Sequence, residues 1–217
     1  STLASSSAAS DVYKRQIQFF TYKKLVEAVK NSQAKSGTAI VLDNSTGEIL
    51  AMASFPSYNP NNSNRKSQKN RALLDTYEPG SVLKPIAMAK AFDIGLIDID
   101  DTLDTSPGYI SLNNYSISDY KNHGLLKAYE VITNSSQVGA SKIALMLGAD
   151  NIISTYKNFG FSKPINLNFP SASFGTINTR NNMSDIEIAN LGFGYGMEAS
   201  PYPVSYTHLR AHETRGN

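Results

Sequence analysis

A serine three residues ahead of a lysine can act as a nucleophile with its own base, because residues i and i+3 share one face of a helix. The spacing alone selects nothing, since this chain of 217 residues contains it five times. The pairs are Ser32–Lys35, Ser63–Lys66, Ser81–Lys84, Ser118–Lys121 and Ser154–Lys157. The sequence around each pair therefore has to show which of them has the setting that catalysis requires.

Ser81 has that setting, because it follows Tyr-Glu-Pro-Gly and opens an apolar run that predicts a helix ending at Gly95. Unpaired N–H groups and the positive end of the helix dipole favour an alkoxide there. Lys84 lies one turn later, and apolar Val82 and Leu83 predict a dry site that lowers the pKa of the lysine. The alternative is that Gly80–Ser81 only caps a helix.

The other four pairs lack this context. Ser32–Lys35 falls at the end of a predicted helix, Ser63–Lys66 in a long polar loop, Ser118–Lys121 in a polar turn and Ser154–Lys157 inside a short helix. Serine and lysine are ordinary surface residues in such places. We therefore take only Ser81 as a candidate nucleophile.

The three histidines support neither a metal site nor a catalytic triad. His208 and His212 have the i, i+4 spacing of two zinc ligands, but no glutamate adjoins His208 and no third ligand is in view. His123 stands in a polar stretch that predicts a loop. We expect no metal and no cofactor.

Apolar periodicity indicates an α+β fold, with strands followed by helices. We expect helices over 17–33, 81–94 and 135–147, a further helix after Asp150, a β-hairpin over 38–54 and short strands over 108–120. A polar loop with two prolines separates the hairpin from the Ser81 segment.

Composition and charge exclude several classes of partner and of catalytic group. Apolar residues make up 41% of the chain, which suffices for one domain with a core. The net charge of +2 comes from scattered residues, so nucleic acid is not an expected partner. The chain has no cysteine, so a nucleophile must be a hydroxyl, and it has no apolar run of membrane-spanning length. Residues 1–16 and 204–217 lack apolar periodicity, and we interpret them as extraneous adapter-like tails around a domain over 17–203.

Three longer segments stand in order along the chain, namely SGTAIVLDNSTGEILAMASFPSYNPN, NRALLDTYEPGSVLKP and SSQVGASKIALMLG. They resemble the hairpin before the nucleophile, the nucleophile motif and the second motif of the transpeptidase domain of class B penicillin-binding proteins. FGFSKPINLNFP and FGYGMEASPYP resemble the stretch beyond. The combination of Asn-Arg-Ala with Tyr-Glu-Pro-Gly is more similar to the division-septum type of the family than to the elongation type.

The chain departs from the family pattern twice. The second motif is normally Ser-x-Asn, whereas Ser135-Ser136-Gln137 carries an amide that is one methylene longer. The triplets Ser57-Tyr58-Asn59 and Ser111-Leu112-Asn113 are decoys that do not open helices. The third motif, Lys-Ser/Thr-Gly, is matched only by Lys35-Ser36-Gly37, which precedes the nucleophile. We therefore expect a partial domain whose C-terminal strands are missing, with edges left unpaired and no acylation by residues 1–217 alone.

The resemblance implies an antiparallel sheet flanked by helices and a peptidoglycan D,D-transpeptidase at the extracytoplasmic face of the bacterial cytoplasmic membrane. It implies that Ser81 attacks a stem peptide, that Lys84 and Ser135 move protons, and that Gln137 and Gly80 bind substrate. Stem peptides, β-lactams and membrane proteins of the division machinery are the implied partners. Two alternatives remain, namely a β-lactam hydrolase or sensor and a catalytically inactive division scaffold.

Overall fold

The computed structural model describes residues 2–57, 69–164, 172–202 and 204. The chain forms two compact units. Unit 1 consists of residues 1–76, 164–174 and 200–217, and unit 2 of residues 77–163 and 175–199. Among the helices of the described ranges, none has the length and apolar character needed to cross a membrane.

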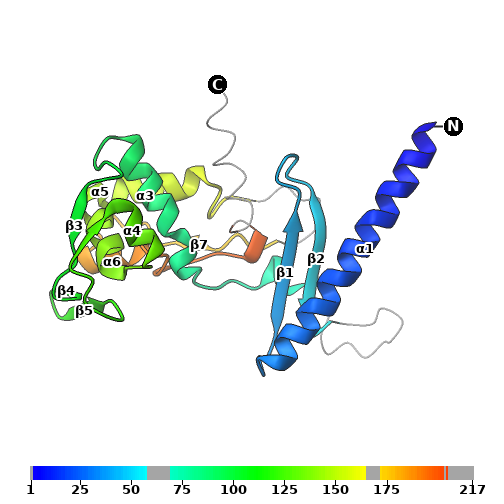
Figure 1. Ribbon diagram of the computed structural model, residues 1–217, viewed down its shortest axis with the longest axis horizontal. Helices are drawn as coiled ribbons and strands as arrows, with labels where there is room; N and C mark the ends of the chain where they lie inside the picture. Colours follow the sequence, from blue (N-terminus) through cyan, green and yellow to red (C-terminus); the bar gives the residue numbers. More distant parts are fainter. Residues whose placement is uncertain (1, 58–68, 165–171, 203, 205–217) are drawn as a thin grey trace. The chain divides into compact units, whose positions relative to one another are not determined.

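Unit 1 is a helix against a β-hairpin (Figure 1). Strands β1 (Gly37–Leu42) and β2 (Ile49–Phe55) pair antiparallel, as predicted for 38–54. Their turn is held by Asp43, whose carboxylate accepts the N–H groups of Ser45 and Thr46 at 2.8 and 2.9 Å. A short helix, α2 (Arg71–Leu74), follows the hairpin.

Helix α1 (Thr2–Asn31) packs along β2, and the Gln18 side chain exchanges two hydrogen bonds with the Met52 backbone at 2.9 and 3.0 Å. The prediction that this helix starts at Ile17 was wrong. Once a helix is nucleated, each added residue gains a backbone hydrogen bond, so helix can extend through alanine-bearing sequence that has no apolar stripe. Whether residues 1–16 are extraneous remains a prediction.

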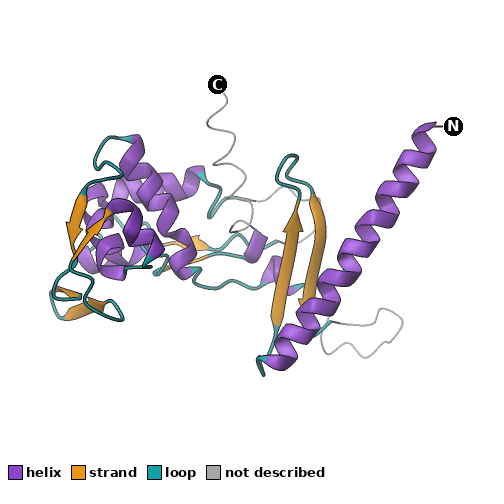
Figure 2. Ribbon diagram, viewed as in Figure 1, coloured by secondary structure: helices purple, strands orange, loops and turns teal. Residues whose placement is uncertain are grey.

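Unit 2 is mainly helical, and short antiparallel strand pairs lie beside its helices (Figure 2). Its first half contains the 3₁₀ turn η1 (Gly80–Leu83), α3 (Lys84–Asp93), β3 (Thr102–Asp104), β4 (Tyr109–Leu112), β5 (Tyr115–Ser118) and β6 (Leu125–Lys127). Its second half contains α4 (Ala128–Thr133), α5 (Gln137–Asn158), β7 (Thr176–Ile177), α6 (Asp185–Leu191) and β8 (Met197–Glu198). Strand β3 pairs with β6, β4 with β5, and β7 with β8.

Helix α5 is the centre of unit 2, where it packs against both α3 and α6. Val138, Ile143 and Ala144 are buried on its apolar face, which is the helical register that the sequence predicted. The helix is interrupted at Gly148, whose backbone is non-helical at φ 75° and ψ 164°. The two predicted helices, one ending at Gly148 and one following Asp150, are therefore both present, joined at this glycine.

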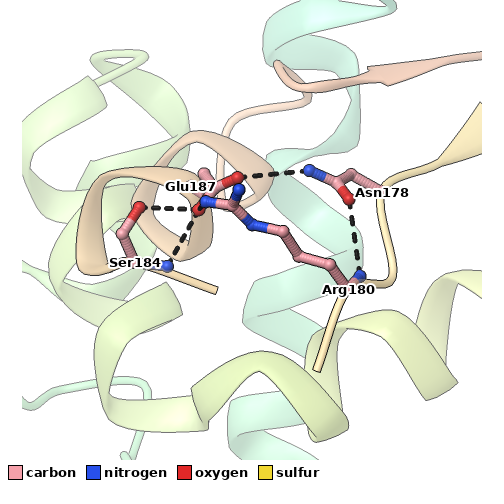
Figure 3. A network of polar contacts seen from close by, with 4 residues as sticks. All are labelled: Asn178, Arg180, Ser184 and Glu187. Atoms are coloured by element: carbon pink, nitrogen blue, oxygen red, sulfur yellow. Dashed lines mark hydrogen bonds and ion pairs between the residues drawn. The ribbon is translucent and has the colours of Figure 1, made fainter. Parts of the chain in front are cut away.

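The start of α6 is fixed by a polar network around Glu187 (Figure 3). Its carboxylate accepts the backbone N–H of Ser184 at 2.9 Å and the Ser184 hydroxyl at 2.6 Å, and it pairs with Arg180. Asn178 donates to the same carboxylate at 3.2 Å. The two Ser184 hydrogen bonds and then the Arg180 hydrogen bond lower the pKa of Glu187 to about 2. This capping box holds the helix that leads into residues 192–199.

Candidate functional site

Ser81 lies in η1, which runs directly into α3, so the predicted position at a helix start is confirmed. Its side chain is exposed, whereas the next turn enters the core at Leu83. Val82 is 61% exposed, so the expectation that it helps to keep the site dry was wrong. On a 3₁₀ turn, residues one position apart point in different directions, and only Leu83 faces inward here.

Lys84 is buried, with 2% of its surface exposed. Its surroundings are largely apolar and include Met88, Val131 and Ile143. Burial lowers the pKa of Lys84 to about 8, and the nearby Asp119 charge opposes that shift. A lysine in this range supplies neutral amine at moderately alkaline pH, as a general base must.

The Lys84 amine reaches Ser135, which lies 51 residues later in the chain. Nζ lies 3.0 Å from Ser135 Oγ and also donates to the Ser135 carbonyl oxygen. Among the residues that the structure describes, no hydrogen bond joins Lys84 to the Ser81 hydroxyl. The structure thus brings the lysine of the first motif to the serine of the second, while Ser81 is linked to Lys84 through one turn of backbone.

The second motif opens α5, as predicted. Ser135 has a positive φ of 52°, and Ser136 is the N-cap residue, whose hydroxyl accepts the Gly139 N–H at 2.9 Å. Gln137 is the first helical residue. The motif therefore consists of a strained serine, a capping serine and an amide on the first turn.

Asp119 holds this motif in place, and sequence reasoning missed it. Its carboxylate accepts the Ser136 hydroxyl at 2.6 Å and the backbone N–H groups of Gln137 and Val138 at 2.5 and 3.1 Å. Negative charge at a helix N-terminus is stabilising. The only signal in the sequence was a carboxylate near the end of the predicted strand region over 108–120, and nothing local linked it to residues 17 positions away.

Gly80 has a positive φ of 67°, and its N–H donates to the Gly194 carbonyl at 3.1 Å. That N–H group is therefore already used inside the protein. The predicted substrate-binding role of Gly80 remains a prediction, and its observed contact is with residues 192–199.

The described decoys belong to elements other than η1, α3 and α5, which carry the candidate site. Ser111-Leu112-Asn113 ends β4 and enters a turn, and Lys35-Ser36-Gly37 lies at the start of β1 in unit 1. His123 stacks edge-on with Tyr120 at 5.1 Å. His208, His212, Ser63–Lys66 and Tyr58-Asn59 lie outside the described residues, and within the described part of the chain no three metal-ligating side chains cluster.

Comparisons with known proteins agree with this arrangement. The model of the penicillin binding protein transpeptidase domain matches residues 37–205. The chain is 38% identical over 187 residues to a probable peptidoglycan D,D-transpeptidase PbpC of Pseudomonas aeruginosa, covering 84% of this chain and 33% of that protein. It is 36% identical over 193 residues to the peptidoglycan D,D-transpeptidase FtsI of Escherichia coli (strain K12), covering 88% and 32%.

The fold comparison points the same way. The transpeptidase domain of Burkholderia pseudomallei penicillin-binding protein 3 matches with a TM-score of 0.81 and 31% identity, covering 90% of this chain and 55% of that one. The predicted α+β fold of the penicillin-binding-protein type is therefore confirmed. The chain spans about a third of the length of the curated relatives it matches. Because the family model matches residues 37–205, the chain belongs to the penicillin-binding protein transpeptidase family.

Proposed function

We propose that this chain carries the nucleophile and proton-transfer groups of a peptidoglycan D,D-transpeptidase of the division-septum type. The observation that carries the proposal is the buried Lys84 amine, one turn from Ser81 and 3.0 Å from Ser135 Oγ. Its low pKa supports a base, and its contact with Ser135 supports a proton path.

In the proposed reaction, Ser81 Oγ attacks the carbonyl carbon of the penultimate D-Ala of a stem peptide, and its proton passes to Lys84 Nζ. The peptide C–N bond then breaks, and Ser135 passes a proton from Lys84 to the departing D-Ala amine. The amine of a second stem peptide then attacks the acyl-enzyme ester, so that the new C–N bond forms, the ester C–O bond to Ser81 breaks and the amine's proton returns to Ser81 Oγ. A β-lactam acylates the same serine, because its ring opens to an ester that remains attached.

The test is covalent labelling of the parent protein by a fluorescent penicillin, where the parent protein is the longer chain of which residues 17–203 are expected to be part. The parent protein is expected to form a lasting adduct and Ser81→Ala to form none, as read by gel fluorescence. Ser154→Ala, at another Ser-x-x-Lys pair, is the control and should label normally. Undiminished labelling of Ser81→Ala would contradict the proposal.

The same labelling distinguishes the two alternatives. Rapid release of hydrolysed antibiotic in place of a lasting adduct would favour a β-lactam hydrolase. A parent protein that binds penicillin without any covalent adduct would favour an inactive scaffold.

Gln137 is proposed to take the place of the usual second-motif asparagine as a substrate contact. Its backbone is fixed by Asp119 at the first turn of α5, which supports a defined position for the side-chain amide. Gln137→Asn should leave the acylation rate within roughly tenfold, about 1.4 kcal/mol of barrier, whereas Gln137→Ala should lose more. If both variants acylate at the parental rate, Gln137 has no such role.

We further propose that the parent protein acts at the extracytoplasmic face of the bacterial cytoplasmic membrane on peptidoglycan stem peptides, with division-machinery proteins as partners. The names of the FtsI and PenA relatives, both given as peptidoglycan D,D-transpeptidases, support the substrate, whereas the location and the partners rest on the family resemblance. A fluorescent fusion of the parent protein is expected to localise at the division septum, and a fusion that does not localise there would contradict the proposed location.

A further inference from the structure

Residues 192–199, which follow α6, form hydrogen bonds along the turn that carries Ser81. Tyr77 and Ala199 exchange two backbone hydrogen bonds, each of 3.0 Å. Three residues later, the Gly80 N–H donates to the Gly194 carbonyl at 3.1 Å. The turn is therefore attached to this segment both before and at the residue preceding the candidate nucleophile.

A side chain adds a third attachment between these two. The Glu78 carboxylate accepts the backbone N–H of Gly196 at 2.9 Å, across 118 positions of sequence. A hydrogen bond from N–H to an ionised carboxylate is stronger than one between neutral groups. Glu78 thus holds the middle of the turn to the middle of the segment.

Gly194 approaches the turn so closely that no side chain fits. Its φ is 80°, and a Cβ atom at this position would lie 2.8 Å from Gly80 N and 2.9 Å from Gly80 C. Both contacts are with backbone, which cannot rotate aside as a flexible side chain can. Any larger residue at position 194 must displace Gly80, and Ser81 with it.

The start of the segment, at Gly192, is fitted closely to α5. A Cβ atom on Gly192 would lie 2.6 Å from the Ala140 carbonyl oxygen and 2.6 Å from Ala144 Cβ. Helix α5 begins with the second motif at Gln137. Residues 192–199 therefore connect the helix of the second motif to the turn of the nucleophile through tight backbone contacts.

We propose that residues 192–199 position Ser81 for acylation, with Gly194 and Glu78 as positioning residues. The inference rests on the proposed function, because it requires Ser81 to be the acylated residue. Misplacing a reacting atom by about 1 Å costs on the order of a hundredfold in rate. The segment acts by setting where Ser81 Oγ stands relative to Lys84 and Ser135.

The first experiment replaces Gly194 in the parent protein. The rate of acylation is followed against penicillin concentration, which separates the affinity of the initial complex from the acylation rate constant. Gly194→Ala should lower the acylation rate constant by about a hundredfold and leave the affinity largely unchanged. The matched control is Gly95→Ala, since Gly95 also has a positive φ, 66°, but a Cβ there meets nothing within 4 Å.

The second experiment uses Glu78 and does not depend on tolerance of a crowded site. Glu78→Ala should slow acylation by about tenfold, the scale of a lost hydrogen bond to a charged group. Glu78→Gln keeps an oxygen acceptor for the Gly196 N–H and should restore the rate to within about threefold. Asp104→Ala is the control, because Asp104 also accepts a backbone N–H, from Ser106 at 2.8 Å, in the same unit.

Ser81→Ala is run beside these variants, so that the two proposals fail separately. If Ser81→Ala still labels, the proposed function is wrong. If Ser81→Ala is silent while Gly194→Ala and Glu78→Ala acylate at the parental rate constant, the positioning role is overturned and the function stands. If Gly194→Ala is too unstable to fold, as its melting temperature would show, the acylation rates of Glu78→Ala and Glu78→Gln decide the positioning role, and equal rates for the two variants overturn it.

Discussion

The surroundings of Lys84 distinguish it from the described lysines of the other Ser-x-x-Lys pairs. The side chain is buried among apolar residues, and desolvation of its ammonium lowers its pKa to about 8. Within the described chain, its amine contacts the hydroxyl and carbonyl oxygens of Ser135, and the hydroxyl can both accept and donate a hydrogen bond. Burial and the contact with Ser135 are the two features that support the proposed role of Lys84 as a base.

Asp119 has two effects on the proposed base, and we expect them to change the acylation rate in opposite directions. It caps the second motif through Ser136 and the first N–H groups of α5, and its charge raises the pKa of Lys84 against the effect of burial. The cap orders the proton path, while the charge keeps more of the lysine protonated.

The pH dependence of acylation tests this balance. The rate should rise as pH increases through about 8, because only neutral Lys84 takes the Ser81 proton, and should level off above that. Asp119→Asn removes the charge that favours the ammonium, so the pKa of Lys84 falls and the rising limb moves to lower pH. The measurement is penicillin acylation of the parent protein between about pH 6 and 10, a range that brackets the pKa.

Glu130→Gln provides the control for the Asp119 variant. Glu130 accepts the Lys127 N–H at 2.8 Å and caps α4, but it is not among the charges that shift Lys84. Glu130→Gln should leave the rising limb of the acylation rate at the same pH as in the parent protein. A limb that does not move in Asp119→Asn would show that Asp119 acts only as a cap.

At the scale of elements, α5 owes its form to one glycine. Gly148 adopts φ 75° and ψ 164°, a region that is essentially restricted to glycine. The first part of α5 carries the second motif and packs on α3, whereas the part after the break carries buried Ile152 and Tyr156. The change in direction allows both apolar faces to be buried.

Gly148→Ala should therefore destabilise the chain by about 1–3 kcal/mol, the cost of such a backbone conformation for a residue with Cβ. Steric overlap does not contribute, since a Cβ at Gly148 meets nothing within 4 Å. The free energy of unfolding in urea, followed by helical circular dichroism, measures the change.

The exposed helical substitution Met146→Ala is the matched control for Gly148→Ala. Substitutions at such surface positions usually change stability by less than about 0.5 kcal/mol. A Gly148→Ala variant as stable as this control would mean that α5 continues without the break.

At the scale of the whole molecule, the described chemistry gathers in one of the two units. Ser81, Lys84, Asp119 and the second motif all belong to unit 2. Its core includes Val131, Val138 and Phe161, each with no exposed surface. Unit 1 contains the hairpin and α1, and the strand β1 is only half-buried along its length. The site is thus assembled within a unit that has its own core, although the chain spans about a third of its curated relatives.

The sequence by itself determined the hairpin, the helix after Ser81, the start of α5 and its break at Gly148, because apolar periodicity, capping serines and glycines are local signals. It also marked Ser81, Lys84, Ser135 and Gln137, through motifs that resemble a known family. It misplaced the start of α1, since helix propagation needs no apolar stripe. Tertiary structure alone decided that Lys84 meets Ser135, that Asp119 caps α5 and that Gly194 touches Gly80. These contacts join residues that are 51, 18 and 114 positions apart, and such pairs are brought together by the packing of the core, which no local pattern in the sequence encodes.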